Sequence, residues 1–161
     1  MLAARVAPPR RALDLAMGRG RHALVLARNG FRVFGVDVKE DAVRDAMLDA
    51  AHENLRVRGW CADLTVYPLP VDTFDLVVIT RYLQRHLFAS IRRAVKPGGF
   101  VLYETFTVAQ RTFGTGPTSP DHLLEPGELR REFGAWDVLF YEEVAAPDAV
   151  ARLAAQRSFN T

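Results

Sequence analysis

The sequence lacks the features that mark disulfide-bonded, membrane-spanning and metal-binding proteins. Cys61 is the only cysteine, which excludes a disulfide framework and favours a reducing, cytoplasmic setting. No apolar run approaches the ~18 residues that span a bilayer, so we expect no membrane partner. His52, His86 and His122 do not have the spacing of metal ligands, and no second cysteine accompanies them. We therefore expect no metal site.

Lysine and dense runs of positive charge are also scarce. Of 21 basic residues only Lys39 and Lys96 are lysines, and the net charge is +2. The arginines alternate with acidic residues, most clearly along Val43–Arg58, and the arginine-rich usage is typical of genomic base composition. A dedicated nucleic-acid binder concentrates its basic residues in one patch. We therefore expect no nucleic-acid partner.

Length and composition indicate one globular domain over residues 1–161. Hydrophobic content of 49% and charged content of 25% lie at globular averages, which disfavours disorder. Met1–Arg10 is basic and free of acidic residues, as in some transit peptides, but it holds no apolar stretch of signal-peptide length. We interpret it as a short leader to the domain.

Strand-like and helix-like patterns alternate along most of the chain. The apolar runs that predict strands are Arg11–Ala16, Arg32–Val38, Arg56–Ala62, Phe74–Thr80 and Phe100–Thr105. The runs that predict helices are Gly20–Arg28, Glu40–His52 and Leu83–Val95, the last ending at Lys96–Gly99. Strands that alternate with helices of this length favour a parallel sheet of the α/β class.

The pattern changes after the fifth predicted strand. Phe106–Glu125 is rich in glycine and proline and is long enough to suggest a function. A short helix is predicted at Glu128–Phe133, and two strands, Trp136–Val144 and Val150–Gln156, flank a turn at Ala146–Asp148. The sequence therefore predicts five βα-type units closed by a hairpin.

A glycine-rich loop and a later acidic residue predict a nucleotide-type binding site. Gly18 and Gly20 follow the first strand, where small residues let the backbone approach a ligand and the following helix presents its positive end. Asp37 ends the second strand, where a carboxylate accepts hydrogen bonds from ribose hydroxyls. A tight turn that needs glycines is the simpler alternative for the loop. We also expect Asp37 to cap the helix that begins at Glu40.

These motifs resemble the class I S-adenosylmethionine-dependent methyltransferases over nearly the whole chain. The matching elements are Asp14-Leu-Ala-Met-Gly-Arg-Gly20, Asp37, Asp63 before Leu64, Phe74-Asp75-Leu-Val-Val and Lys96-Pro-Gly-Gly99. The phrases similar to the small tellurite-resistance-type subgroup are Gly20–Leu24, Glu125–Phe133 and Trp136–Glu143. The resemblance implies a doubly wound Rossmann-like sheet of seven strands in the order 3-2-1-4-5-7-6, with the last strand antiparallel.

The resemblance also implies S-adenosyl-L-methionine as the cofactor. The positions it assigns to cofactor binding are Asp14, Ala16, Gly18, Gly20, His22, Asp37, Val38, Asp63, Leu64 and Thr80. Asp63 would accept from the adenine amino group and the Leu64 amide would meet a ring nitrogen, whereas a plain turn aspartate before Thr65 is the simpler alternative. Asp75 begins its strand, far from the ligand edge, and is expected to be structural.

The acceptor side is expected near the end of the fourth strand and the strand beside it. Methyl transfer is an in-line displacement that needs alignment more than an acid–base pair, so no catalytic residue is assigned. Arg81 and Arg85 are the candidates to hold an anionic substrate and Tyr82 to form a wall, with Glu104 nearby. A small anion is expected between Arg81 and the Phe106–Glu125 loop. Arginines that solvate a helix start are the simpler alternative. The acceptor is expected to be a small molecule, and the protein a monomer or homodimer.

Two departures from the family pattern leave other functions open. Ala16 replaces the first glycine, which is tolerable where its φ stays negative, and Met17 occupies a commonly small position. Only ten residues precede Arg11, so the N-terminal cap helices are expected to be short or absent. The alternatives are a degenerate methyltransferase-like binding domain without turnover and a dinucleotide-dependent oxidoreductase. The second is disfavoured because Ala23 stands where that fingerprint has its third glycine.

Overall fold

The computed structural model describes residues 10–159, which form seven strands and four α-helices. The strands are β1 (Arg11–Leu15), β2 (Arg32–Asp37), β3 (Val57–Cys61), β4 (Phe74–Thr80), β5 (Val95–Phe106), β6 (Asp137–Val144) and β7 (Val150–Gln156). The predictions of a leader and of short or absent cap helices concern residues 1–9. Those residues lie outside the described part of the chain.

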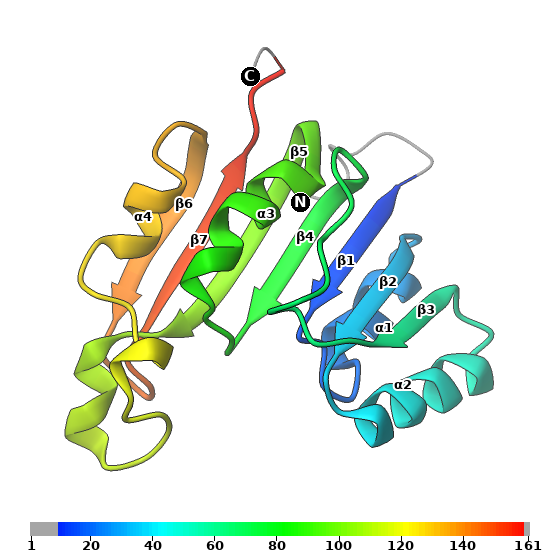
Figure 1. The fold of residues 1–161 in the computed structure, drawn as a ribbon, viewed down its shortest axis with the longest axis horizontal. Helices are drawn as coiled ribbons and strands as arrows, with labels where there is room; N and C mark the ends of the chain where they lie inside the picture. The colour runs from blue at the N-terminus through cyan, green and yellow to red at the C-terminus, as the bar shows by residue number, and fades with distance from the viewer. Residues whose placement is uncertain (1–9, 160–161) are drawn as a thin grey trace.

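All seven strands belong to one sheet, in the order β3-β2-β1-β4-β5-β7-β6 (Figure 1). The strands β1 to β5 pair in parallel, and β7 runs antiparallel to both β5 and β6. The predicted order and the antiparallel last strand are therefore confirmed. The carboxyl ends of the parallel strands meet at the lower edge of the sheet in Figure 1, which is the edge where ligands bind in such sheets.

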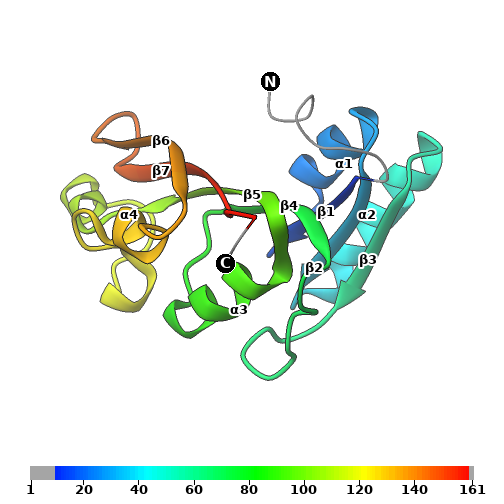
Figure 2. The same cartoon turned by 90° about the horizontal axis from the view of Figure 1, so that it is seen from above.

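Helices cover both faces of the sheet. They are α1 (Arg21–Arg28), α2 (Glu40–His52), α3 (Phe88–Ala94) and α4 (Glu128–Glu132), with 3-10 turns η2 (Arg85–Leu87), η3 (Val108–Phe113) and η4 (Pro120–His122). The first two α-helices lie on one face and the other two on the opposite face (Figure 2). No helix in the described residues is long and apolar enough to cross a membrane.

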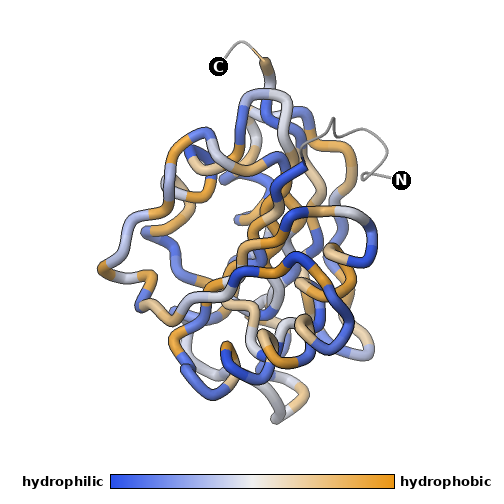
Figure 3. The backbone as a smooth tube through the Cα atoms, turned by 90° about the vertical axis from the view of Figure 1, so that its right-hand side faces the viewer, coloured by the Kyte–Doolittle hydropathy of each residue, from blue (hydrophilic) through white to orange (hydrophobic). Residues whose placement is uncertain are grey.

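Each face of the sheet has its own apolar core, because successive strand residues point to opposite faces. In β4, Leu76 and Val78 pack with α1 and α2, whereas Val77 and Ile79 pack with α3 and α4. A strand buried on both sides needs a continuous apolar run, and the sequence of β4 provides one. Figure 3 shows the hydrophobic segments gathered in the middle of the molecule.

The boundary between α3 and β5 differs from the prediction. The predicted helix Leu83–Val95 is replaced by η2 and α3, and the strand begins at Val95 instead of Phe100. Val95 pairs with Phe74, and a register shift follows in β4. The segment 96–99 leaves the helical conformation, with Gly98 at a φ of +78°, and the backbones of Gly98 and Gly99 form hydrogen bonds with Arg157, just after β7. This pairing joins residues far apart in sequence, so a local stop signal does not reveal it.

The segment 106–125 is irregular, as predicted, but it is compactly folded. It contains η3 and η4, and its two ends meet in a bridge between Thr107 and Leu124. Gln110 is only 1% exposed; its side chain donates to the Thr115 carbonyl and accepts from the Ala149 amide in the β6–β7 turn. The segment is therefore anchored beside the carboxyl end of β5 (Figure 1).

Candidate functional site

An open cavity of about 380 Å³ lies at the carboxyl ends of β1, β2, β3 and β4. It is within the size range of small-molecule sites. Its walls are formed by Ala16, Asp37, Val38, Lys39, Ala62, Asp63, Leu64, Thr65, Arg81, Tyr82 and Gln84. Half of the positions predicted for the cofactor and two of those predicted for the acceptor therefore line one space.

Asp37 connects the second strand to the glycine loop. One carboxylate oxygen accepts from the Gly18 N–H at 2.8 Å, and the other accepts from the Lys39 N–H at 2.9 Å. A carboxylate offers about four lone-pair directions, so each oxygen can still accept a further hydrogen bond. The expected capping of α2 is wrong: its N-cap residue is Lys39, and no side chain caps the helix. Asp37 closes a local turn and still faces the cavity.

The two glycines of the loop have different roles. Gly18 has a φ of +54°, and an added Cβ would meet no atom within 4 Å, so the backbone there lies open to a ligand. Gly20 has a φ of +79°, and an added Cβ would lie 2.8 Å from the Cβ of Ala46 in α2. Gly20 therefore allows α1 and α2 to pack closely, and it does not line the cavity. The ligand-binding interpretation of the loop therefore applies to Gly18, and the packing interpretation applies to Gly20.

Ala16 adopts the left-handed conformation, with a φ of +57°. The condition under which alanine is tolerable there, a negative φ, is therefore not met. This conformation costs roughly 1–2 kcal/mol for a residue with a Cβ. Met17, the other unusual residue, is buried away from the cavity, with its thioether packed over Gly35 and close to Gly59. The Ala16 side chain lines the cavity, whereas the Met17 side chain leaves it open.

Asp14 does not reach the cavity. Its side chain is 1% exposed and accepts the Ala23 N–H of α1 at 2.9 Å. Burial raises the pKa of Asp14 to about 7, against the lowering effect of that hydrogen bond. The predicted cofactor contact of Asp14 is thus replaced by a contact that fixes α1 against β1.

The start of α1 keeps free hydrogen-bond donors. Its N-cap is Gly20, which offers no capping side chain, and the N–H groups of Arg21 and His22 bond no acceptor in residues 10–159. Burial and the charge of Arg21 lower the pKa of His22, which favours its neutral form. An anion at this point would meet backbone N–H groups and the helix dipole.

Asp63 and Leu64 present an acceptor beside a donor. One oxygen of Asp63 accepts from the Thr65 amide at 2.8 Å and from its hydroxyl at 2.7 Å, and these bonds lower the pKa of Asp63. The other oxygen and the Leu64 N–H have no partner in the described chain. The turn interpretation of Asp63 is therefore correct, and it leaves one oxygen free for a ligand.

Thr80 and Glu104 lie outside the cavity lining, at the ends of β4 and β5. They are register partners on neighbouring strands. Glu104 pairs with Arg152 at 2.6 Å, and its charge acts on His22 across the α1 side of the sheet. The structure therefore brings these residues together beside the cavity but not in its wall.

Arg81 forms a junction at the rim of the cavity. Its guanidinium lies 3.0 Å from Asp148 and 3.4 Å from Glu104, and 4.4 Å from the centre of the Phe106 ring. Its φ of +57° is a second left-handed conformation. Strained non-glycine residues of this kind cluster at functional sites. Arg81 joins the end of β4 to β5 and to the β6–β7 turn.

Arg85 points to a different place. It makes a two-pronged ion pair with Glu128 of α4, at 2.6 and 2.9 Å, and donates to the Pro120 and Leu123 carbonyls. Arg85 therefore holds the 106–125 segment to α4. Arg81 is likewise paired, with Asp148 and Glu104, and the anion expected between Arg81 and the 106–125 segment stays a prediction.

Sequence reasoning missed four residues that line the cavity: Lys39, Ala62, Thr65 and Gln84. The first three are chain neighbours of predicted residues, so including the flanks of each motif finds them. Gln84 was assigned to the helix, whereas its backbone is extended. Asp75 has the predicted structural role, since it accepts the Arg11 amide and pairs with Lys96. No cluster of three or more possible metal ligands is present in residues 10–159.

Comparison with known proteins identifies the same family. Residues 12–99 match the family model described as a methyltransferase domain. A curated relative, hemagglutinin 1 of Eikenella corrodens, is 30% identical over 156 residues, which cover 89% of this chain and 51% of that protein. The chain thus spans about half the length of this relative.

Solved structures share the fold. TehB from Haemophilus influenzae has a TM-score of 0.79 and 21% identity, over 97% of this chain and 60% of TehB. An S-adenosylmethionine-dependent methyltransferase from Mesorhizobium loti has a TM-score of 0.75 and 21% identity, over 97% and 95%. The family model covers more than half of the sequence. The chain belongs to the methyltransferase domain family.

Proposed function

We propose that this chain transfers a methyl group from S-adenosyl-L-methionine to a small-molecule nucleophile. One observation carries the proposal: Asp37, the free oxygen of Asp63 and the unpaired Leu64 N–H face a single cavity beside the open backbone of Gly18. These groups supply acceptors for hydroxyl and amino hydrogens and a donor for a ring nitrogen. That is the set of hydrogen bonds a nucleoside needs.

The chemistry of these groups fits the cofactor part by part. Asp37 would accept from the ribose hydroxyls, and Asp63 with Leu64 would hold the adenine edge. The N–H groups at the start of α1 would bind the carboxylate, since that helix end is uncapped. Two predicted positions act indirectly: Asp14 fixes α1, and Gly20 lets α1 approach α2.

When bound, the cofactor supplies a methyl group activated by a positively charged sulfur. The chain's own task is then to align an acceptor and to exclude water, which lowers the entropic cost of the displacement. Tyr82 and Arg81 stand at the rim where an acceptor enters. The ion pairs of Arg81 with Glu104 and Asp148 hold that rim in place.

We infer a small acceptor from the compact form of this rim. The 106–125 segment is anchored through Gln110 and Arg85, so it forms a fixed wall beside the end of β5. A soft nucleophile such as a thiol, or an oxyanion, needs no general base from the protein. This agrees with a site in which no residue is assigned as a general base. Cytoplasmic location and a monomeric or homodimeric state remain predictions.

Titration calorimetry with S-adenosylmethionine, S-adenosylhomocysteine and NAD tests the proposal. We expect the first two to bind and NAD to give no heat. Incubation with S-adenosylmethionine and panels of small thiols and oxyanions should then release S-adenosylhomocysteine, with Asp37→Asn as the matched negative control. NAD binding alone would support the oxidoreductase.

A second candidate is a binding domain without turnover, which the strained Ala16 at the cavity wall favours. For such a domain we expect binding of S-adenosylmethionine and S-adenosylhomocysteine, and no methylated product with any acceptor. Restoring glycine by Ala16→Gly separates the two functions further. Activity that appears only in this variant would identify the natural chain as degenerate.

A further inference from the structure

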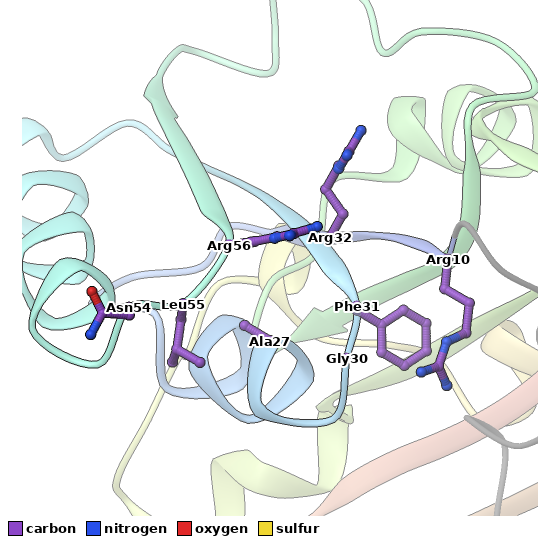
Figure 4. Close-up of a pocket in the computed structure, with 8 residues that line it drawn as sticks. All are labelled: Arg10, Ala27, Gly30, Phe31, Arg32, Asn54, Leu55 and Arg56. Carbon is purple, nitrogen blue, oxygen red and sulfur yellow. The ribbon is translucent and has the colours of Figure 1, made fainter.

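A second hollow, of about 400 Å³, lies at the opposite edge of the sheet (Figure 4). It is lined by Arg10, Ala27, Gly30, Phe31, Arg32, Asn54, Leu55 and Arg56. None of these residues lines the cavity at the carboxyl ends of the strands. Three of the eight are arginines, so the hollow carries a concentrated positive charge that the family motifs do not explain.

Strand pairing places the three arginines on neighbouring strand starts, with Arg32 and Arg56 in register and Arg10 one position before the partner of Arg32. The Arg32 amide donates to the Arg10 carbonyl at 2.9 Å, and the Val33 amide donates to the Arg56 carbonyl at 3.0 Å. The three residues therefore stand at the starts of β1, β2 and β3, on backbones spaced about 4.8 Å apart. Arg58 adds a further charge, since it lines an adjoining hollow with Arg32 and Arg56.

Two of the three guanidinium groups have no counter-charge. Arg32 and Arg56 are exposed and make no ion pair or side-chain hydrogen bond within residues 10–159. Glu53, an acidic residue close in sequence, is already paired with Arg28. Like charges on neighbouring strands destabilise a sheet. An anion bound between them would remove that repulsion.

Arg10 is held in a fixed position at the wall of the hollow. Its guanidinium lies 4.9 Å from the centre of the Phe31 ring, and one of its nitrogens donates to the Asn29 carbonyl at 3.2 Å. Figure 4 shows Arg10 beside that ring, with Arg32 and Arg56 extending from the neighbouring strands. A guanidinium that is already ordered loses less entropy when it binds an anion.

We propose that this arginine hollow binds a compact anion that carries two or more phosphate groups. Guanidinium groups bind phosphate oxygens in pairs, and several of them within one hollow require several phosphates to match their charge. A single-stranded nucleic acid fits less well, because such sites present aromatic rings for base stacking. The one ring in the lining, Phe31, is 3% exposed.

Calorimetry with inorganic tripolyphosphate on the full chain at low salt tests the proposal. We expect one binding site per chain, and an affinity at least about tenfold lower in the double variant Arg32→Ala/Arg56→Ala, as for the loss of two charge-assisted contacts. The matched control is Arg44→Ala/Arg93→Ala. It removes the same charge from exposed positions on α2 and α3 and should keep the wild-type affinity.

Three other measurements bear on the proposal. Tripolyphosphate should raise the unfolding temperature of the wild type and not that of the Arg32/Arg56 variant, and both double variants should keep the wild-type affinity for S-adenosylhomocysteine. Equal loss of tripolyphosphate binding in the two double variants would overturn the proposal, because it would indicate unspecific charge attraction. Tighter binding of a single-stranded oligonucleotide than of tripolyphosphate would overturn it in favour of nucleic acid.

Discussion

The two edges of the sheet differ in charge: the cavity at one edge is lined by both acidic and basic residues, and the hollow at the other by arginines without an acidic residue. At the carboxyl ends of the strands, Asp37 and Asp63 face the cavity beside unpaired backbone N–H groups. At the amino ends, Arg10, Arg32 and Arg56 surround a hollow of similar size. The first edge is built from loops and turns that follow the strand ends, whereas the second is built from strand starts and the turns before them, where Gly30 and Asn54 are also left-handed. The loops at the first edge place donors and acceptors one by one. The strand starts at the second edge bring several residues of the same charge together.

The largest effect should come from removing the acidic character of the first edge. Because Asp37 would accept two ribose hydrogen bonds, Asp37→Ala should weaken S-adenosylmethionine binding by about 2–3 kcal/mol, as for a lost pair of charge-assisted bonds. Titration calorimetry measures this loss. Asp41→Ala, an exposed acid in the first turn of α2, is the control. An unchanged affinity with the fold intact would remove Asp37 from the binding site.

The second effect concerns Asp14, the buried acidic residue of β1. The pKa of Asp14 is raised from 3.8 to about 7 in the folded protein, so the folded state binds this proton more tightly than the unfolded state. The stabilisation that results is fully present below about pH 4 and is lost as the pH rises to about 7. Relative to Asp14→Asn, the wild type should lose about 2 kcal/mol of unfolding free energy between pH 5 and pH 8.

Chemical unfolding of both proteins across this pH range provides the measurement. The charge of Asp37 also raises the pKa of Asp14, so the Asp37→Asn variant should show a smaller loss that is complete at a lower pH. A constant difference between wild type and Asp14→Asn would show that Asp14 titrates alike in the folded and unfolded states.

Arg81 tests whether a positive charge at the first edge serves binding or turnover. Arg81→Ala should lower turnover by about tenfold and leave S-adenosylhomocysteine affinity nearly unchanged, because the residue orders the rim through Glu104 and Asp148. Arg92→Ala, which removes an ion pair with Glu132 on the α3 side, is the matched control. Equal loss of turnover and affinity would place Arg81 on the cofactor.

The smallest effect concerns the backbone strain at Ala16, at the carboxyl ends of the strands. Ala16→Gly should raise the unfolding free energy by about 0.5–1 kcal/mol, since relief of the left-handed conformation exceeds the entropy that glycine adds to the unfolded chain. Ala109→Gly, at an exposed position of η3, has no positive φ to relieve and should destabilise. A destabilised Ala16→Gly would show that its methyl group contributes packing in the cavity wall.

The sequence predicted the strands and turns at the carboxyl edge of the sheet because the sequence patterns that specify them are local. The apolar run of β4, the glycines after β1 and the acidic residue at the end of β2 each lie within a few positions of the structure they specify. Among the residues predicted from motifs, those that line the cavity stand at or just after the end of a strand. Asp14 and Gly20 belong to the same motif but serve packing, which spacing alone does not distinguish.

By itself the sequence determined the order of elements, the family and the edge at which a ligand binds, since periodicity and glycine placement act over short distances. Only the tertiary structure decided the φ of Ala16, the pairing of Arg85 with Glu128 and the gathering of Arg10, Arg32 and Arg56. Those arginines lie far apart along the chain, so the sequence showed no basic patch. Parallel pairing brings together strand starts about 20 residues apart, and the charge of the second edge exists only after that pairing.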